Sequence, residues 1–472
     1  MDAVSRHTTF CFTLRPTAEQ EQALWRHAGA ARFAYNQCLR MVVDGLEAKK
    51  DQPDRRVPWS GFDLINAINS WKRSEAAGTD EQGKPGLSWR GEVCQQVFEE
   101  AAVDLGRALE AFSKSRRGKR RGKKVRFPRF KKRASSRPSF RLRNKTTKAR
   151  SMIRLGEGEA RTVRLPKLGV LRVREDTRKL RRMLAKGRAK VLFATVSRRA
   201  SGHWRVSLNV EAADLHPARR HRDAERAEAV GIDRGLSTFA VVAEASGRQL
   251  ERLDSPRPLR AALPKLRRAS RALSRKKLGS RNRSRAKVRL AKLHQRIGNV
   301  RRDFVHRESS RLAKTHGRLV LEDLCTIGLM RTNLARSLAD SAWALFAQKL
   351  TYKVAWYGGQ LTLADRFFPS TRRCSACGDI GDALPLSKRT FRCRRCGHEA
   401  DRDTNAAACL GQYPDLAWPH VAGKHPETPN VCGEESAGAQ ARPARETGLG
   451  EAERAPARRP RRAVSTETVD TL

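Results

Sequence analysis

The chain has 472 residues and carries 99 Lys and Arg against 49 Asp and Glu, which gives a formal net charge of +50 at pH 7. A surplus of this size exceeds what solubility needs, so it predicts a polyanionic partner, with nucleic acid the first candidate. The alternative is that the arginines are merely solvated surface residues favoured by a GC-rich genome. Such a genome would explain why Arg replaces Lys, but it would not explain the surplus of positive charge. No apolar run is long enough to span a bilayer and no signal peptide is visible, which argues against a membrane protein and predicts a cytoplasmic location.

A strand and then a helix are predicted near the N-terminus. Residues 8–16, TTFCFTLRP, alternate in polarity, and Thr17 and Gln20 follow with the spacing of a capping box. From residue 20 to residue 112 the pattern is mostly helical, with polar, Gly- and Pro-bearing breaks at 51–58 and 78–86. We therefore expect a small helical domain.

A strongly basic segment follows these helices. Residues 114–133, KSRRGKRRGKKVRFPRFKKR, are mostly Lys and Arg, which predicts contacts to phosphates, although a solvated charged loop is the alternative. Phe127 and Phe130 could stack on bases, but aromatic residues beside proline more often anchor a loop to its domain. The predicted nucleic-acid-binding residues are Lys119, Arg120, Arg121, Lys123, Lys124, Arg126, Arg129, Lys131 and Lys132.

Three alternating runs in the middle of the chain predict short strands. They are TVRLPKLGVLRV at 162–173, AKVLFATVSR at 189–198 and HWRVSLNVE at 203–211, separated by polar turns. We expect a compact β-barrel or sandwich from them. Residues 216–228 then have the composition of a linker.

The second half of the chain predicts buried strands around a long basic helix. Residues 229–247, AVGIDRGLSTFAVVAEASG, predict two strands joined by a tight turn, with Asp233 on the first. A long helix is expected next, and its Arg and Lys between 286 and 314 could track phosphates beside an apolar seam. HGRLVLEDL predicts a buried strand ending in Glu322 and Asp323, and another strand follows from Gly358. The seam consists of Ala286, Leu290, Leu293, Ile297, Val300, Phe304 and Leu312.

Four cysteines form a pair of CxxC motifs with the spacing that places four thiolates around one zinc ion: Cys374, Cys377, Cys393 and Cys396. A redox site would use one CxxC at the start of a helix, so the duplication favours zinc. A closed four-cysteine site leaves no position for water, and the zinc is therefore expected to be structural, with His398 a spare ligand. The other cysteines are scattered singly and predict buried or incidental thiols: Cys11, Cys38, Cys94, Cys325, Cys409 and Cys432.

Three acids that are distant in the sequence form a second candidate site. Asp233 is expected in a strand, Glu322 at the end of a strand and Asp403 at the start of a helix. In an RNase H-like fold such carboxylates gather around two Mg²⁺ ions roughly 3.5–4 Å apart, and the natural reaction is phosphodiester hydrolysis. Each acid alone is more simply explained as a cap or an ion-pair partner. Their apolar neighbours favour the site, because a lone carboxylate in a buried strand is costly.

Asp403, and not Asp401, is the predicted ligand in the motif DRDTNAA. On a helix Asp403 shares the face of Ala407 and Leu410, which must pack on the sheet, whereas Asp401 is turned roughly 200° away. Asp401 is expected to cap the helix or to pair with a cation, a role worth on the order of 1 kcal/mol.

These motifs together resemble a known family. GIDRGL, WYGGQLTLADRFFPSTRRCSACG and FRCRRCGHEADRDTNAA are similar to segments of the transposon-encoded TnpB proteins and of the miniature type V CRISPR effector nucleases, as are TLRPTAEQEQAL and FPRFKKR. The resemblance covers most of residues 8–410, and it matches Asp233, Glu322 and Asp403 to the three RuvC acids. It implies an RNA-guided DNA endonuclease with two Mg²⁺ ions and one structural Zn²⁺. The implied partners are a guide RNA and target double-stranded DNA, with recognition of a short motif beside the target, in a prokaryotic cytoplasm near the nucleoid.

The resemblance also implies an α+β multidomain fold. An N-terminal β-barrel wedge domain, residues 1–19 and 113–215, would hold an inserted helical recognition lobe, residues 20–112. An RNase H-like RuvC nuclease domain, residues 229–372 and 398–420, would hold an inserted zinc ribbon, residues 373–397. The linker at 216–228 joins the two halves. The last segment, 421–472, is rich in Glu, Ala, Arg, Pro and Gly and is predicted to be a disordered tail.

Other functions are alternatives to an RNA-guided DNA endonuclease. An RNA-guided DNA-binding protein that acts without cleavage would be favoured by loss of a RuvC acid, but the set is complete. A transposition-associated regulator is a further alternative. The transposase itself is disfavoured, because a single-strand transposase of the commonest neighbouring type needs a His-hydrophobe-His metal pair and none of the 11 His forms one.

Overall fold

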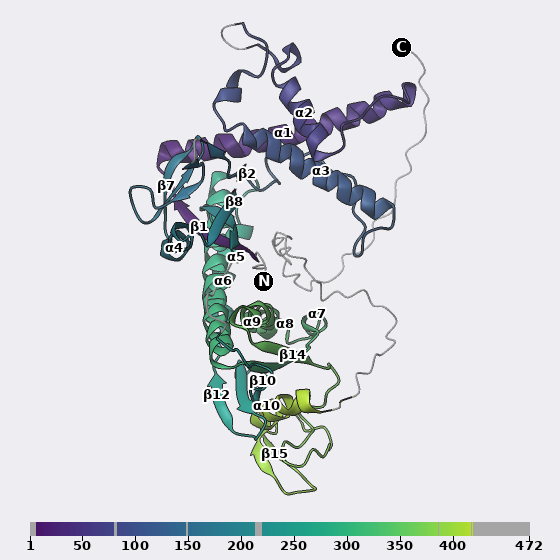
Figure 1. The fold of residues 1–472 in the computed structure, drawn as a ribbon, viewed down its shortest axis with the longest axis vertical. Coiled ribbons are helices and arrows are strands. Elements are labelled where there is room, and N and C mark those ends of the chain that lie inside the picture. Colours follow the sequence, from purple (N-terminus) through teal and green to yellow (C-terminus); the bar gives the residue numbers. More distant parts are fainter. Residues whose placement is uncertain are drawn as a thin grey trace. The chain divides into compact units, whose positions relative to one another are not determined.

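The computed structural model describes residues 6–79, 83–147, 150–212, 220–385, 387–416 and 418 (Figure 1). The predicted tail at 421–472, Cys432 and the first predicted linker residues, 216–219, lie outside this described part. Among the described helices, none combines the length and the apolar character that a membrane crossing requires.

The N-terminal strand and helix are present where the sequence predicts them. β1 (Arg6–Arg15) leads into α1 (Ala18–Asp51). The capping box is confirmed, because the Gln20 N–H donates to Thr17 Oγ1 at 3.2 Å and the Thr17 N–H donates to Gln20 Oε1 at 3.1 Å. The helical region continues with α2 (Gly61–Trp71), short 3-10 turns at Glu75–Ala77 and Ser88–Gly91, and α3 (Gln96–Arg116).

Seven strands from distant segments form one antiparallel sheet, in the order β2-β8-β9-β1-β7-β6-β5. β1 joins its two parts, because residues 6–13 pair with β9 and residues 14–15 pair with β7. The helix α4 (Arg178–Ala185) follows β7, and a separate hairpin is formed by β3 (Thr146–Thr147) and β4 (Arg150–Ser151). The other strands are β2 (Ser139–Arg143), β5 (Arg154–Leu155), β6 (Thr162–Leu165), β7 (Gly169–Val173), β8 (Ala189–Arg198) and β9 (Trp204–Ala212).

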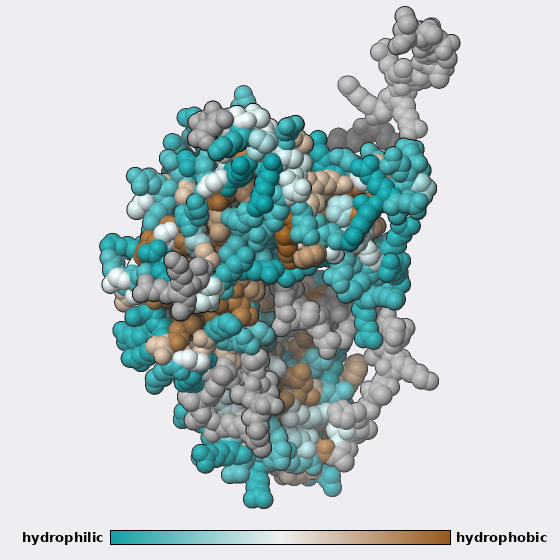
Figure 2. Space-filling view, turned by 45° about the horizontal axis from the view of Figure 1, so that its top comes forward, coloured by the Kyte–Doolittle hydropathy of each residue, from teal (hydrophilic) through white to brown (hydrophobic). Residues whose placement is uncertain are grey.

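The N-terminal helices and this sheet share one hydrophobic core. Leu24 of α1, Leu105 of α3 and Val206 of β9 are fully buried in the same cluster. The ring of Trp204 meets that of Trp25 edge-on, with 5.4 Å between the ring centres. On the face shown in Figure 2 hydrophilic residues predominate around small apolar areas, in keeping with a charged fraction of 31%.

A second sheet of five strands lies in the C-terminal half, in the order β12-β11-β10-β13-β14. β10 (Ala229–Asp233), β11 (Ala240–Glu244) and β12 (Gln249–Leu253) are antiparallel neighbours. β13 (Arg318–Glu322) pairs in parallel with β10, and β14 (Gln360–Ala364) pairs in parallel with β13. The described part of the predicted linker, residues 220–228, contains no helix or strand.

The helices of this half are α5 (Pro258–Ser274), α6 (Arg281–Thr315), α7 (Thr326–Leu329), α8 (Ala335–Ser341), α9 (Trp343–Tyr357) and α10 (Arg402–Gln412), with a 3-10 turn at Tyr413–Asp415. The long helix that the sequence predicts, with its Arg and Lys between 286 and 314, is confirmed as α6, and β12 and α5, which the sequence pattern did not reveal, precede it. β12 is an edge strand, and the margin of a sheet tolerates charged residues. The sequence of β12 therefore lacks a clear alternation of apolar and polar residues.

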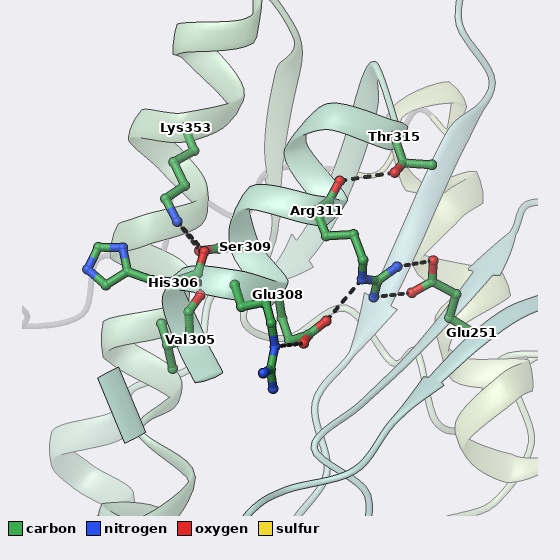
Figure 3. Close-up of polar contacts among 9 residues, drawn as sticks. Glu251, Val305, His306, Glu308, Ser309, Arg311, Thr315 and Lys353 are labelled. Carbon is green, nitrogen blue, oxygen red and sulfur yellow. Dashed lines mark hydrogen bonds and ion pairs between the residues drawn. The ribbon is translucent and has the colours of Figure 1, made fainter. Parts of the chain in front are cut away.

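The second half of α6 is tied to the sheet and to α9 (Figure 3). Arg311 pairs with Glu251 of β12 and with Glu308 one turn earlier. On the other side Lys353 of α9, only 4% exposed, donates to the His306 carbonyl at 2.6 Å and to Ser309 Oγ at 2.8 Å. In the predicted seam Ile297, Phe304 and Leu312 are buried, but Val300 is 41% exposed.

Candidate active site

Asp233 and Glu322 lie at the carboxyl ends of two neighbouring parallel strands. In the register of the sheet Ile232 of β10 pairs with Leu321 of β13, so the next residue on each strand is one of the two acids. The residues before them are buried, whereas both acids are only partly buried. The sheet therefore places the two carboxylates together at its edge.

The helix α10, which carries Asp403, lies beside β10 (Figure 1). It packs directly on β10 where Gly231 leaves room, because a Cβ atom at residue 231 would lie 1.9 Å from the Ala407 carbonyl oxygen and 2.5 Å from the Gly411 nitrogen. Asp403 is in the first turn of α10, and its side chain is 16% exposed.

The carboxylates of Glu322 and Asp403 act electrostatically on Asp233. Burial raises the pKa of Asp233 well above its usual range, and the negative charges of Glu322 and Asp403 raise it further, while Arg234 and Arg402 oppose this. The structure thus brings together the three acids that the sequence singled out. Among the described residues, the ligand atoms of these three acids do not form a group close enough to hold one metal ion, whereas those of the cysteine group below do.

Two polar groups hold Glu322 in place. Ser370, which is 2% exposed, donates its hydroxyl hydrogen to Glu322 Oε1 at 2.8 Å. Arg234, which is 6% exposed, donates from Nη2 to the Glu322 carbonyl oxygen at 2.6 Å, and burial lowers the pKa of this guanidinium to about 10. Sequence reasoning missed both residues. The only signals were a cation directly after Asp233 and a serine four residues before Cys374.

Asp401 has the role of a helix cap that the sequence predicts. Its Oδ1 accepts from the Asp403 N–H at 3.1 Å and from the Thr404 N–H at 3.0 Å, and Oδ2 lies 3.8 Å from a guanidinium nitrogen of Arg252. Asp403, in contrast, has one distant cation, Arg389 at 4.0 Å. The carboxylate of Asp401 is therefore committed to the helix terminus.

The four predicted zinc cysteines form a compact group, with all Sγ atoms within 4.8 Å of one another. The Sγ atoms of Cys374 and Cys396 are 3.7 Å apart and those of Cys377 and Cys393 are 3.6 Å apart. A tetrahedral zinc with Zn–S bonds of about 2.3 Å requires roughly 3.8 Å between sulfurs, so this donor set fits the ion.

The two CxxC motifs form matching knuckles. In the first, the Cys374 N–H donates to the Asp379 carbonyl at 2.8 Å, and in the second the Cys393 N–H donates to that of His398 at 2.9 Å. Each ends in a glycine with positive φ, Gly378 at 78° and Gly397 at 72°, which a tight turn requires. β15 (Thr390–Arg392) and β16 (Glu399–Asp401) flank the second knuckle.

His398 does not belong to the cysteine group. Its Nε2 lies 3.3 Å from Ser375 Oγ. Of the single cysteines, Cys38, Cys94 and Cys409 are buried, and Cys11 and Cys325 are partly buried.

The basic segment at 114–133 leaves α3 and runs without further regular structure toward β2. Phe127 packs edge-on against Phe112, with 5.4 Å between ring centres, while Phe130 is 47% exposed. Lys131 differs from the other predicted phosphate contacts, which are exposed. Its Nζ lies 3.5 Å from the centre of the Tyr35 ring, so it anchors the segment.

Three family models match segments of the chain. A family described as "Probable transposase" matches residues 203–333, the "Cas12f1-like, TNB domain" matches 343–410, and a "Helix-turn-helix domain" matches 1–50. From residue 6 to residue 50 the structure has one strand and one uninterrupted helix. The first match includes Asp233 and Glu322, and the second includes both cysteine pairs and Asp403.

Similarity to named proteins decides the family. A Mycobacterium tuberculosis protein named "Putative RNA-guided DNA endonuclease Rv2885c" is 36% identical over 94% of this chain and 92% of its own length. The "TnpB-like protein L79" of Acanthamoeba polyphaga mimivirus is 31% identical over 28% of this chain and 26% of its own. The chain belongs to the TnpB family. The solved structure titled "Cryo-EM structure of the Cas12f1-sgRNA-target DNA complex" matches 86% of this TnpB chain and 99% of its own, with 13% identity and a TM-score of 0.47.

Proposed function

We propose that this TnpB-family protein is an RNA-guided DNA endonuclease that cuts target DNA by two-metal phosphodiester hydrolysis. The observation that carries the proposal is the meeting of three acids from three elements: Asp233 and Glu322 end neighbouring strands, Asp403 is in the first turn of the helix packed on them, and the charges of Glu322 and Asp403 add to burial in raising the pKa of Asp233. A purely structural role does not account for them, since mutual repulsion of carboxylates destabilises a fold. The name of the M. tuberculosis relative supports the same activity.

Asp233, Glu322 and Asp403 would hold two Mg²⁺ ions, whose preferred ligands are oxygen atoms of this kind. Such a pair, when bound, activates water on one side of the phosphodiester and stabilises the leaving oxygen on the other. The protein would position these ligands. Ser370 orients the carboxylate of Glu322, and Arg234 holds the end of β13, which carries Glu322. Burial and the two neighbouring carboxylates raise the pKa of Asp233, so a bound cation would favour its charged form.

We assign residues 229–372 and 398–420 to a RuvC-like nuclease domain, with the zinc ribbon at 373–397 inserted. Three antiparallel strands followed by two parallel ones support an RNase H-like fold. Residues 1–19 and 113–215 would form the wedge domain around a recognition lobe at 20–112. The pairing of β1 with strands of residues 139–212 supports this discontinuous assignment.

The proposed partners are a guide RNA and target double-stranded DNA. A net charge of +50 supports them, because the phosphates of a guide, a target strand and a displaced strand need many cations. Base pairing would read the sequence, while the protein contacts the backbone and a short motif beside the target. The exposed part of the segment 114–133 and the exposed first half of α6 are the surfaces that we assign to these contacts.

Cleavage by the protein purified with its own RNA tests the proposal. The RNA that copurifies is sequenced, and its guide portion defines a target, which is placed in plasmids beside randomised flanks. We expect the wild-type protein to cut plasmids that carry the target and one class of flank. The Glu322→Gln variant should bind the same plasmids without cutting. A purified protein that carries no RNA, or that cuts plasmids with and without the target equally, contradicts the proposal.

A further inference from the structure

The backbone that carries the first zinc cysteine is bound by α10. Asn405, 1% exposed, accepts from the Ser375 N–H at 3.0 Å and donates from Nδ2 to the Arg373 carbonyl at 2.8 Å. These two peptide groups lie on either side of Cys374. Asn405 is two residues from Asp403, so the helix turn that presents the third acid is fastened to the zinc knuckle.

Two more residues of α10 form hydrogen bonds to residues 373–375. Cys409 Sγ donates to the Arg373 carbonyl at 3.1 Å. Gln412 Nε2 donates to the Ser375 carbonyl at 2.7 Å, and its Oε1 accepts from Arg373 Nη1. The contacts are spread over the length of the helix, from its first turn to its last, so a displacement of the knuckle moves all of α10.

The other side of the knuckle reaches Glu322. The Arg373 N–H donates to the Pro369 carbonyl at 2.9 Å, which closes a tight turn from Pro369 to Arg373, directly before Cys374. The buried hydroxyl of Ser370 donates to the Glu322 carboxylate. Residues 369–375 therefore contact Glu322 directly and contact the helix that carries Asp403. The conformation of this segment depends on Cys374, which the zinc ion would bind.

We propose that the first zinc knuckle positions Glu322 and Asp403, with Ser370 and Asn405 as positioning residues, so that zinc occupancy and Mg²⁺ binding are coupled. The inference rests on the proposed function, because it takes the acids as Mg²⁺ ligands. Coupling between two sites is reciprocal, so each ion strengthens the binding of the other by the same factor. Groups that orient metal ligands typically change metal affinity about 10–100-fold.

Zinc affinity gives a readout that needs no cleavage. The full-length protein is equilibrated with a chromogenic zinc chelator, and the zinc transferred at equilibrium, which gives the zinc affinity, is measured with MgCl₂ and with NaCl at the same ionic strength. We expect Mg²⁺ to raise the zinc affinity of the wild type at least about fivefold, the lower end of typical coupling. Asp233→Asn, which removes a proposed Mg²⁺ ligand and leaves the knuckle contacts, should show no such increase.

Ser370→Ala tests the path to Glu322. It should keep one zinc per chain but raise the Mg²⁺ concentration for half-maximal cleavage about 10–100-fold. Asn405→Ala, which removes the acceptor of the Ser375 N–H and leaves the Arg373 carbonyl with Cys409 Sγ as its donor, should bind zinc more weakly than the wild type. Ser341→Ala is the matched control, because among the described residues the partner of this buried hydroxyl is the Ser337 carbonyl of its own helix.

Two results separate this inference from the proposed function. If the wild type cleaves DNA in a manner that depends on Asp233 while Mg²⁺ leaves the zinc affinity unchanged, the coupling is wrong and the nuclease assignment stands. If Mg²⁺ neither shifts thermal unfolding nor supports cleavage, the proposed function fails. Equal Mg²⁺ requirements in Ser370→Ala and the wild type also overturn the positioning role.

Discussion

Gly231 of β10 lies so close to Ala407 of α10 that a Cβ atom at residue 231 would be 1.9 Å from the Ala407 carbonyl oxygen. The obstructing atoms belong to backbone, which cannot rotate away. This contact sets how near Asp403 comes to Asp233.

Gly231→Ala is therefore expected to separate the helix from the sheet. Overpacking of this kind costs about 1–3 kcal/mol or more, and each kcal/mol lowers the Tm of a domain of this size by roughly 2–4 °C. Thermal unfolding measures the loss. Gly298→Ala on α6 is the control, because its nearest neighbour is the flexible end of Arg302 at 3.8 Å, and the change should be neutral or stabilising. Equal stability of the two variants would contradict the contact.

Asp233→Asn should stabilise the protein in Mg²⁺-free buffer and abolish cleavage. The folded-state pKa of Asp233 is raised, so the folded state holds a proton that the unfolded state, with a pKa of about 3.9, gives up. Stability is thus lost as pH rises through the interval between these pKa values. The gain in Tm, roughly 2–4 °C per kcal/mol, should be largest at neutral pH and vanish near pH 4. A variant that is less stable than the wild type at pH 7 rules out the repulsion.

Lys353→Met probes a buried cation that has no carboxylate partner among the residues that the structure describes (Figure 3). Burial lowers the pKa of Lys353 to about 8. Between this value and the unfolded pKa of about 10.4 the unfolded chain holds more protons, so stability rises with pH. The free energy of unfolding of the wild type should therefore increase relative to that of Lys353→Met from pH 8 to pH 10, by up to about 1.4 kcal/mol per pH unit. Urea unfolding at several pH values measures the difference in the free energy of unfolding between the two proteins. A difference that does not change with pH would show that burial does not lower the pKa of Lys353.

Neutralising Arg120, Arg121, Lys123 and Lys124 with Gln should weaken nucleic-acid binding and make its salt dependence shallower. Each lost phosphate contact reduces the slope of log K against log salt by about 0.7–0.9. Filter binding between low and physiological salt gives the slope. Lys131→Gln is the comparison, because Lys131 packs on Tyr35 and should affect stability more than the slope. An unchanged slope in the variant with all four substitutions would show that these residues are solvated charges that do not contact phosphates.

The features that could be predicted from the sequence are those encoded by local spacing. Thr17 and Gln20 mark a helix start, the two CxxC pairs mark a metal group, and apolar neighbours of Asp233 and Glu322 mark buried strands. Asp401 as a cap also follows from its place before the helix. In each case neighbours along the chain determine the outcome.

The features that the sequence did not reveal depend on contacts between distant segments. Ser370 meets Glu322 and Asn405 meets Arg373 only because the sheet and α10 bring them together. Lys131 looked like its basic neighbours, but Tyr35 of α1 fixes it. β12 was missed since an edge strand tolerates the charged residues that also suit a helix.

Cleavage by Asp403→Asn and Asp401→Asn tests the central claim most directly. Asn is as good a helix cap as Asp, so Asp401→Asn keeps the start of α10 while removing one charge. With guide RNA, target DNA and Mg²⁺ supplied, we predict that Asp403→Asn binds the target without cutting and that Asp401→Asn retains most of the cleavage. An active Asp403→Asn protein beside an inactive Asp401→Asn protein would contradict the account.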